Sequence, residues 1–297
     1  MTRIFVIFNP AARGEKSQRL RQFLESKAAD GVVLAPTLCT GDATRLAGEG
    51  VRQGCDVIVA AGGDGTINEV INGLGDTGVA LGILPLGTVN VFAKELGIPH
   101  NFAEAWAVVE AGLVRAVDLA SAAFAGKRRH FCQLAGVGFD ARAVRRASWE
   151  LKKKVGPLAY VWAGLKVLGE SHAPVEVQLP HAKVAGVAVF VGNGRYYGGK
   201  IRLFPQAKLD DGLLDVCVFE RCGYLDLLRY GPAVLCARHT RLRGVHYFQT
   251  QELVCNGAEP APFELDGEDA GDAPVSFSVK PRALRVIVSR SNGGKHA

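Results

Sequence analysis

The sequence lacks the features of a secreted, disulfide-bonded or membrane-spanning protein. Its 297 residues include seven cysteines, an odd number, widely spread and without a CxxC pair, so neither a disulfide framework nor a zinc site is expected. The apolar run at 4–8 is too short for a signal-peptide core or a membrane span, and no later run reaches spanning length. We therefore expect a cytoplasmic protein whose cysteines are small core residues.

Several catalytic signatures are also missing. The sequence has no HExxH, no Gly-x-Ser-x-Gly elbow, no GxxxxGK[ST] loop and no GxGxxG followed by a ribose-binding acid. The scattered histidines are interpreted as structural, and covalent acyl chemistry is not supported. No helix-turn-helix, zinc-finger or RNP-like pattern accompanies the net charge of +6, so no nucleic acid partner is expected.

The most informative stretch is 57–70, where a strand leads through a glycine turn into a helix. The β-branched run 57–61 is typical of a parallel strand buried on both faces. The glycines of 62–65 allow positive φ and close approach of a ligand, and a helix starting near Thr66 offers free N–H groups to an anion. Asp64 is unexpected in a turn that only cradles phosphate. It indicates a metal or a sugar hydroxyl, or else it simply caps the helix.

The first part of the chain alternates strands and helices, which predicts a doubly wound parallel sheet. Asp42 is expected to cap the second helix. Turns at Asn9-Pro10 and at Gly87-Thr88 follow strands, at the edge where open α/β sheets bind ligands. The predicted strands are 3–8, 32–40, 57–61 and 79–84, and the predicted helices include 16–29 and 102–111.

After about residue 115 short strands separated by turns dominate, which predicts a β-rich sandwich. Two domains are expected, 1–115 and 116–289, with a frayed tail at 290–297 and a last strand that can return to the first domain. The predicted strands are 114–119, 130–135, 175–179, 184–192, 213–219, 244–248, 251–255, 275–279 and 284–288, with helices near 141–154, 158–168 and 224–236.

Charge is unevenly placed in the second domain. Nine cations lie within 127–154 against Asp140 and Glu150, which suits an anionic membrane surface or else a solvated helix face. The turn 205–213 is a candidate hard-cation site or an ordinary Asp-Gly turn. Four carboxylates within 264–269 suit a general base or a magnesium ligand, or else a solvated acidic hairpin.

Five motifs follow one another along the chain: Asn9-Pro10 with Gly14, Gly62 to Thr66 followed by Asn68-Glu69-Val70, Leu86-Gly87-Thr88 with Asn90, Asp211-Gly212-Leu213, and Glu264 to Glu268. Taken in order, they resemble the signature of the bacterial diacylglycerol kinase-like lipid kinases, a family that includes sphingosine and ceramide kinases. Gly-Gly-Asp-Gly-Thr alone is shared with NAD kinases and is similar to a phosphofructokinase motif, but the extension Asn68-Glu69-Val70 and the late acidic motif favour the lipid branch. The resemblance covers essentially the whole chain.

The resemblance implies an NAD kinase-like or phosphofructokinase-like α/β domain, a β-rich lipid-substrate domain, and phosphorylation of a lipid hydroxyl, such as that of diacylglycerol, in the cleft between them. It implies ATP and Mg²⁺ as cofactors. Glu268 would be the proton acceptor, with Asp266 and Asp64 completing an acidic, magnesium-handling centre. A structural Mg²⁺ would be held by backbone oxygens of Lys208 and Leu213 and by Asp211. The implied ATP contacts are Asn9, Thr40, Gly62, Gly63, Asp64, Gly65, Thr66, Ile67, Asn68 and Thr88.

One residue departs from the family pattern, because Val91 stands where many members carry an acid. Two other functions stay open, a soluble NAD kinase-type enzyme and a catalytically inactive nucleotide-binding or lipid-binding protein. The implied partners are a lipid alcohol and, by peripheral contact, the inner membrane face. The sequence does not decide the oligomeric state, and a dimer stays open.

Overall fold

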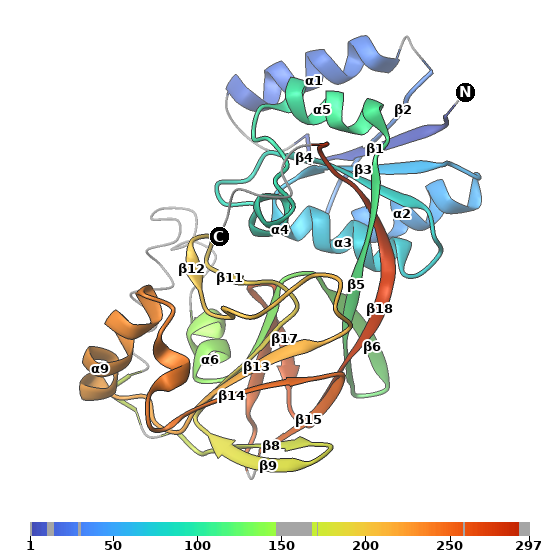
Figure 1. The fold of residues 1–297 in the computed structure, drawn as a ribbon. Helices are drawn as coiled ribbons and strands as arrows, with labels where there is room; N and C mark the ends of the chain where they lie inside the picture. The colour runs from blue at the N-terminus through green and yellow to red at the C-terminus, as the bar shows by residue number, and fades with distance from the viewer. Residues whose placement is uncertain are drawn as a thin grey trace. The chain divides into compact units, whose positions relative to one another are not determined.

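The computed structural model describes residues 2–10, 15–28, 31–146, 168–170, 172–257 and 259–290. The chain divides into two compact units, which we call the N-terminal unit (Met1–Leu119 with Arg282–Ala297) and the C-terminal unit (Ala120–Pro281) (Figure 1). Most of the helix expected at 158–168, the second half of that expected at 141–154, and nearly all of the predicted frayed tail lie outside the described residues.

The N-terminal unit contains the predicted parallel sheet, and its strands lie in the order β2-β1-β3-β4. Ile7 pairs with Ala35 on one side and with Ala60 on the other. Because helices cover both faces of this sheet, both faces of its strands are buried, and the strands are nearly continuous apolar runs. The last strand, β18, joins β4 in parallel at Val286 and Leu81. The strands are β1 Ile4–Phe8, β2 Val33–Pro36, β3 Val57–Gly62, β4 Ala80–Pro85 and β18 Val275–Ile287.

The helices of this unit form two layers, one on each face of the sheet (Figure 1). On one face, Phe23 of α1 packs against Phe102 of α5, with ring centroids 5.2 Å apart. On the other face α2 and α3 lie close together, because a Cβ at Gly73 would be only 2.3 Å from the carbonyl oxygen of Thr44. The helices are α1 Glu15–Ala28, α2 Asp42–Arg52, α3 Asp64–Leu74, α4 Val91–Glu95 and α5 Phe102–Ala111.

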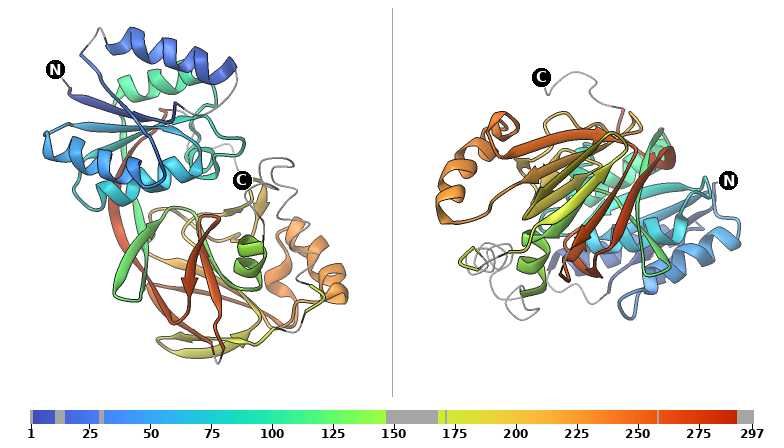
Figure 2. Two further views of the ribbon diagram at one scale, coloured as in Figure 1. Left: turned by 180° about the vertical axis from the view of Figure 1, so that it is seen from behind. Right: turned by 90° about the horizontal axis from the view of Figure 1, so that it is seen from below.

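The C-terminal unit is the predicted β-rich sandwich (Figure 2). One core lies between its two sheets and includes Val137 and Phe263 from one sheet and Val177 and Phe277 from the other. The first sheet has the order β6 (Lys127–Phe131), β5 (Val114–Phe124), β18, β15 (Glu252–Gly257), β8 (Val175–Leu179), β9 (Ala182–Gly186). The second is antiparallel: β14 (Val245–Thr250), β13 (Leu214–Phe219), β10 (Ala188–Gly192), β7 (Leu134–Gly138), β16 (Pro262–Leu265), β17 (Glu268–Asp272).

Four predicted strands of this unit were wrong in their limits. The strand expected at 130–135 is interrupted, because β6 ends at Phe131 and β7 begins at Leu134. The strand expected at 184–192 is divided at Val187, where the chain passes from the first sheet to the second and donates its N–H to Phe219. The strands expected at 275–279 and 284–288 are the single strand β18. Local pattern alone does not reveal these changes of partner.

Smaller elements complete the unit: α6 Phe139–Arg146, the two-residue strands β11 Tyr196–Tyr197 and β12 Ile201–Arg202, α9 Tyr224–Leu235 and the 3₁₀ turn His239–Arg241. All seven cysteines are free thiols. The prediction that they are core residues is wrong for Cys39 and Cys236, which are exposed. In the part of the chain that the structure describes, no helix is long and apolar enough to cross a membrane.

Candidate functional site

The edge formed by the carboxyl ends of the parallel strands is the first part of the candidate site. The chain adds β2 on one side of β1 and β3 on the other, so the strand order reverses between β1 and β3. Open α/β sheets bind ligands at such a switch point. Asn9 directly follows β1, and Gly62 ends β3.

Two glycine turns meet at this edge, one after β3 and one after β4. A Cβ at Gly87 would lie 2.9 Å from the Cα of Gly63, so the two backbones are in contact. The N–H of Leu86 donates to the carbonyl of Gly62 at 2.9 Å. Asn90 is fully buried in a left-handed conformation, φ 48°, and its Nδ2 donates to the same carbonyl at 3.0 Å. The Gly-Thr-x-Asn motif thus holds the two turns together.

Helix α3 begins at Asp64, two residues earlier than predicted. Its N-cap is Gly63, and no side chain caps the helix, so the alternative in which Asp64 serves as the cap is wrong. The first-turn N–H groups of a helix have no partners within it and attract anions. Gly62 tolerates no side chain, because a Cβ there would lie 2.5 Å from the Cβ of Thr66. The turn is therefore compact, with the side chain of Thr66 packed against Gly62.

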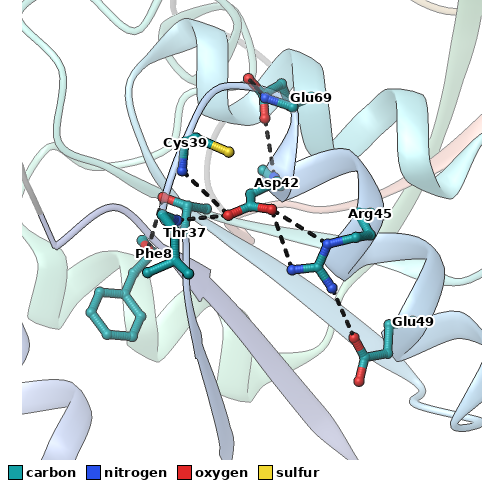
Figure 3. Close-up of polar contacts among 10 residues, drawn as sticks. Phe8, Thr37, Cys39, Asp42, Arg45, Glu49 and Glu69 are labelled. Atoms are coloured by element: carbon teal, nitrogen blue, oxygen red, sulfur yellow. Dashed lines mark hydrogen bonds and ion pairs between the residues drawn. The ribbon is translucent and has the colours of Figure 1, made fainter.

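The loop that carries Thr40 is fixed from helix α3. The carboxylate of Glu69 accepts the N–H groups of Gly41 at 2.9 Å and Ala43 at 3.1 Å, at the start of α2. Figure 3 shows Glu69 above this loop. Thr40 itself is exposed at the same edge as the glycine turns. The sequence placed Glu69 in the Asn68-Glu69-Val70 motif but did not predict that its carboxylate fixes the start of α2.

Asp42 does not cap α2, contrary to the prediction. Gly41 occupies the N-cap position with φ 87°, and Asp42 is the first helical residue. Its carboxylate reaches back to the N–H of Leu38 at 2.8 Å and also contacts Arg45 (Figure 3). The hydrogen bond from Leu38, followed in importance by Arg45, lowers the pKa of Asp42 below its ordinary value. Asp42 therefore closes the loop after β2.

In the C-terminal unit, Asp266 occupies the turn between β16 and β17 with φ 50°. Its carboxylate accepts three backbone N–H groups, from Cys132 at 2.8 Å, Gln133 at 2.9 Å and Leu134 at 3.0 Å. Its own N–H donates to the carbonyl of Leu134 at 2.9 Å. Asp266 thus ties the acidic turn to the break between β6 and β7.

Glu268, two residues later, is half-exposed and lies 3.4 Å from the guanidinium of Arg129. Its neighbour Asp269 is held by Arg145, with N–O distances of 2.8 and 2.9 Å, and Arg145 also reaches Asp272 at 3.0 Å. These carboxylates, Asp269 first, raise the pKa of Arg145.

The acidic turn and the basic cluster at 127–154 therefore neutralise one another in part. Arg146 likewise pairs with Glu170. Three of the nine cations, Arg129, Arg145 and Arg146, are thus paired with carboxylates, and Lys152 to Lys154 lie outside the described residues.

Two further acids, Asp140 and Glu264, form a buried pair close to the turn between β16 and β17. Asp140 of α6 and Glu264 of β16 are 5% and 1% exposed, and a Cβ at Gly136 would lie within 3 Å of a carboxylate oxygen of each. Burial raises the pKa of both carboxyls. At Glu264 the negative charge of Asp140 raises the pKa further. Tyr197 donates to Asp140 at 2.6 Å, and the N–H of Gly267 donates to Glu264 at 2.5 Å. Asp140 and Tyr197 were not predicted, because their partners are distant in sequence.

The predicted cation turn precedes β13. Asp211 is exposed, and its Oδ1 accepts the N–H of Leu213 at 3.1 Å. Asp215 is fully buried, which raises its pKa to about 6, and Tyr247 donates to it. No three His, Cys, Asp or Glu side chains gather as a metal site anywhere in the described ranges. The predicted site would use one carboxylate and two backbone oxygens, including that of Lys208.

Two family models match the chain. The diacylglycerol kinase catalytic domain matches residues 3–122, and the YegS C-terminal NAD kinase beta sandwich-like domain matches residues 134–288. The chain therefore belongs to the family of diacylglycerol kinase-like lipid kinases, as its ordered motifs predicted. By class it is a lipid kinase.

Individual relatives agree with this assignment. "Diacylglycerol kinase" of Bacillus subtilis (strain 168) is 31% identical over 302 residues, covering 98% of this chain and 97% of that protein. "Probable lipid kinase YegS-like" of Pseudomonas aeruginosa (strain UCBPP-PA14) is 34% identical over 293 residues, covering 96% and 93%. A crystal structure of a diacylglycerol kinase from Bacillus anthracis str. Sterne superposes with a TM-score of 0.79 at 27% identity, covering 97% of each chain.

Proposed function

We propose that this protein transfers the γ-phosphoryl group of ATP, in the presence of Mg²⁺, to the hydroxyl of diacylglycerol or a related lipid alcohol. The observation that carries the proposal is the uncapped start of α3 at the switch point of the sheet, in a chain that belongs to a lipid kinase family. Phosphoryl transfer requires mainly positioning and charge neutralisation, which glycine turns and carboxylates can provide without a covalent nucleophile.

The nucleotide is proposed to bind over the turn 62–68. The backbone N–H groups at the start of α3 suit its phosphates, and Asn9, Thr40 and Thr88 follow other strands at the same edge. The closeness of Gly63 to Gly87 supports this fit, because a side chain at either position would stand between the two turns. Ile67 is fully buried and would contribute backbone only.

Glu268 is the proposed proton acceptor. As the lipid hydroxyl oxygen forms its bond to the γ-phosphorus, the bond from that phosphorus to the β–γ bridging oxygen breaks, and Glu268 takes the hydroxyl proton. Its half-exposed position at the start of β17 leaves it open to a substrate. Asp266 is proposed to orient this turn, because its carboxylate already accepts three backbone N–H groups.

The chemistry of the donor set fits Mg²⁺ at two places. Asp64 offers a hard oxygen ligand beside the proposed phosphate site, and Asp211 with the backbone oxygens of Lys208 and Leu213 offers a second set. When bound, Mg²⁺ would neutralise phosphate charge. Val91, at the start of α4, supplies no carboxylate, so Asp64 is the acid that we assign to the nucleotide side.

We further propose that the reaction uses groups from both units, Asp64 of the N-terminal unit and Glu268 of the C-terminal unit. The experiment is incubation of purified protein with γ-labelled ATP, Mg²⁺ and an unfractionated lipid extract, with products resolved by mass. We expect label in a lipid phosphate. A parallel reaction with NAD and no lipid should give none, and label in NADP with none in lipid would overturn the proposal.

A further inference from the structure

Helix α9, Tyr224–Leu235, carries an exposed apolar surface. Among the described residues eight large hydrophobic side chains are exposed, and five of them lie on this 12-residue helix. The leucines are the extreme cases, with exposed fractions of 81% at Leu225, 74% at Leu228 and 74% at Leu235. An apolar concentration of this kind on a surface usually marks a binding site.

Three of the four exposed leucines form a stripe along one side of the helix, and Leu227 lies outside it. Leu225, Leu228, Pro232 and Leu235 are spaced i, i+3, i+7 and i+10, so they share one face. The opposite face is the one that packs on the sheet, because Tyr230 is buried against Phe219, with ring centroids 5.3 Å apart. The fold therefore directs the leucines away from the protein core. Figure 1 shows α9 on the outside of the C-terminal unit.

The segment that contains α9 is strongly basic. Residues 221–243 include five arginines and one acid, Asp226, whose carboxylate accepts the N–H of Gly223 at 3.1 Å at the start of the helix. All five arginines are exposed, and none takes part in an ion pair within the described chain. The arginines are Arg221, Arg229, Arg238, Arg241 and Arg243.

We propose that α9 docks this protein on an anionic lipid bilayer, with the leucine stripe inserted among the acyl chains and the flanking arginines at the phosphate headgroups. A helix with one apolar face and adjoining cations lies in the plane of a membrane interface. Charge complementarity favours this occupant over a second copy of the chain, because a symmetric contact between stripes would bring the two sets of arginines together.

The docking inference rests on one part of the proposed function, namely that the substrate is a lipid. Vesicle binding tests it without any catalysis. The probes are vesicles of phosphatidylglycerol and phosphatidylcholine, and binding is measured by cosedimentation at low and high salt. Wild-type protein should bind the anionic vesicles and be released by salt. Leu225→Gln and Leu228→Gln should each weaken binding about tenfold, and Arg238→Gln and Arg241→Gln about fivefold each.

Matched controls lie on the N-terminal unit. Leu113→Gln replaces another exposed leucine and Arg52→Gln another exposed arginine, and neither should change binding. All substituted positions are exposed, so circular dichroism and melting should match wild type. Leu228→Trp supplies a second measurement, a blue shift of emission on anionic vesicles that Leu113→Trp should not give.

Three results would overturn the inference: no binding of wild type to anionic vesicles, equal binding by the α9 variants, or a change of oligomeric state in those variants. Enzyme assays distinguish a failure of the docking inference from a failure of the proposed function. The α9 variants should lose rate on diacylglycerol in vesicles but keep it on a water-soluble short-chain diacylglycerol. Activity that is absent on both substrates would count against the proposed function and leave the vesicle result to decide the docking.

Discussion

Three neighbouring acids of the β16–β17 turn have different environments, and so different expected roles. Glu264 is buried and contacts Gly267, Asp266 is bound by backbone N–H groups, and Glu268 faces outward beside Arg129. A carboxylate with three N–H partners is already satisfied and suits positioning. The exposed carboxylate is the one that can meet a substrate hydroxyl.

Asp266→Asn tests this division of roles. Asparagine also tolerates a left-handed backbone, so the change removes charge without straining the turn at φ 50°. We expect the free energy of unfolding to fall by about 2 kcal/mol, because hydrogen bonds to a charged group are lost. Glu268→Gln should change it by less than about 1 kcal/mol, since an exposed ion pair contributes little.

Urea denaturation of the two variants and the wild type gives both values. Equal stability of Asp266→Asn and wild type would show that the three N–H contacts do not anchor the turn. A large loss in Glu268→Gln would instead assign that residue a structural role.

At the scale of elements, helix α3 has two roles. Its first turn belongs to the proposed phosphate site, and its second turn fixes the start of α2. Glu69, in its second turn, holds the start of α2 through Gly41 and Ala43. The proposed nucleotide contacts at Thr40 and at 62–68 are thereby joined by one side chain. Displacing the Thr40 loop should weaken nucleotide binding while leaving the proposed proton acceptor untouched.

Glu69→Gln should therefore raise the KM for ATP roughly three- to tenfold with little change in kcat. Glutamine keeps only one acceptor oxygen, so one of the two N–H groups loses its acceptor and faces an amide NH₂ instead. Steady-state kinetics with varied ATP gives this split. Glu49→Gln is the control, since Glu49 contacts Arg45 of α2 and Gln53 at the C-cap of the same helix. A fall in kcat with unchanged KM would contradict a positioning role in nucleotide binding.

The elements that the sequence predicted well are those whose signal is local. The buried parallel strands are continuous apolar runs ended by glycine turns, and α5 was predicted with its exact limits, Phe102–Ala111. The antiparallel strands were harder to delimit. The apolar pattern of 184–192 predicts one continuous strand through Val187. The hydrogen bond from the Val187 N–H to the carbonyl of Phe219 marks the point where the chain changes sheets.

The same distinction applies to the candidate site. The glycine turn and the acidic turn were found because their residues are adjacent in sequence. The contacts of Asp266 with 132–134, of Arg145 with Asp269, and of Tyr197 with Asp140 span 57 to 134 residues, and no short motif encodes them. Partial neutralisation of the basic cluster was missed for this reason.

At the scale of the whole molecule, the chain contains two units that share strands. Both β5 and β18 begin in one unit and end in the other, so the N-terminal sheet is completed by the end of the chain. The proposed function likewise needs both units, with Asp64 in the first and Glu268 in the second. Loss of either carboxylate should abolish most transfer while leaving each fold intact.

The most direct test is the rate of label transfer from γ-labelled ATP to dioctanoylglycerol in mixed micelles, measured for wild type, Asp64→Asn, Glu268→Gln and the exposed control Glu252→Gln. The account predicts labelled lipid phosphate from the wild type and from Glu252→Gln at similar rates. Glu268→Gln and Asp64→Asn should each be slower by about two decades or more. Undiminished transfer by Glu268→Gln, or no transfer to this or any extracted lipid by the wild type, would contradict it.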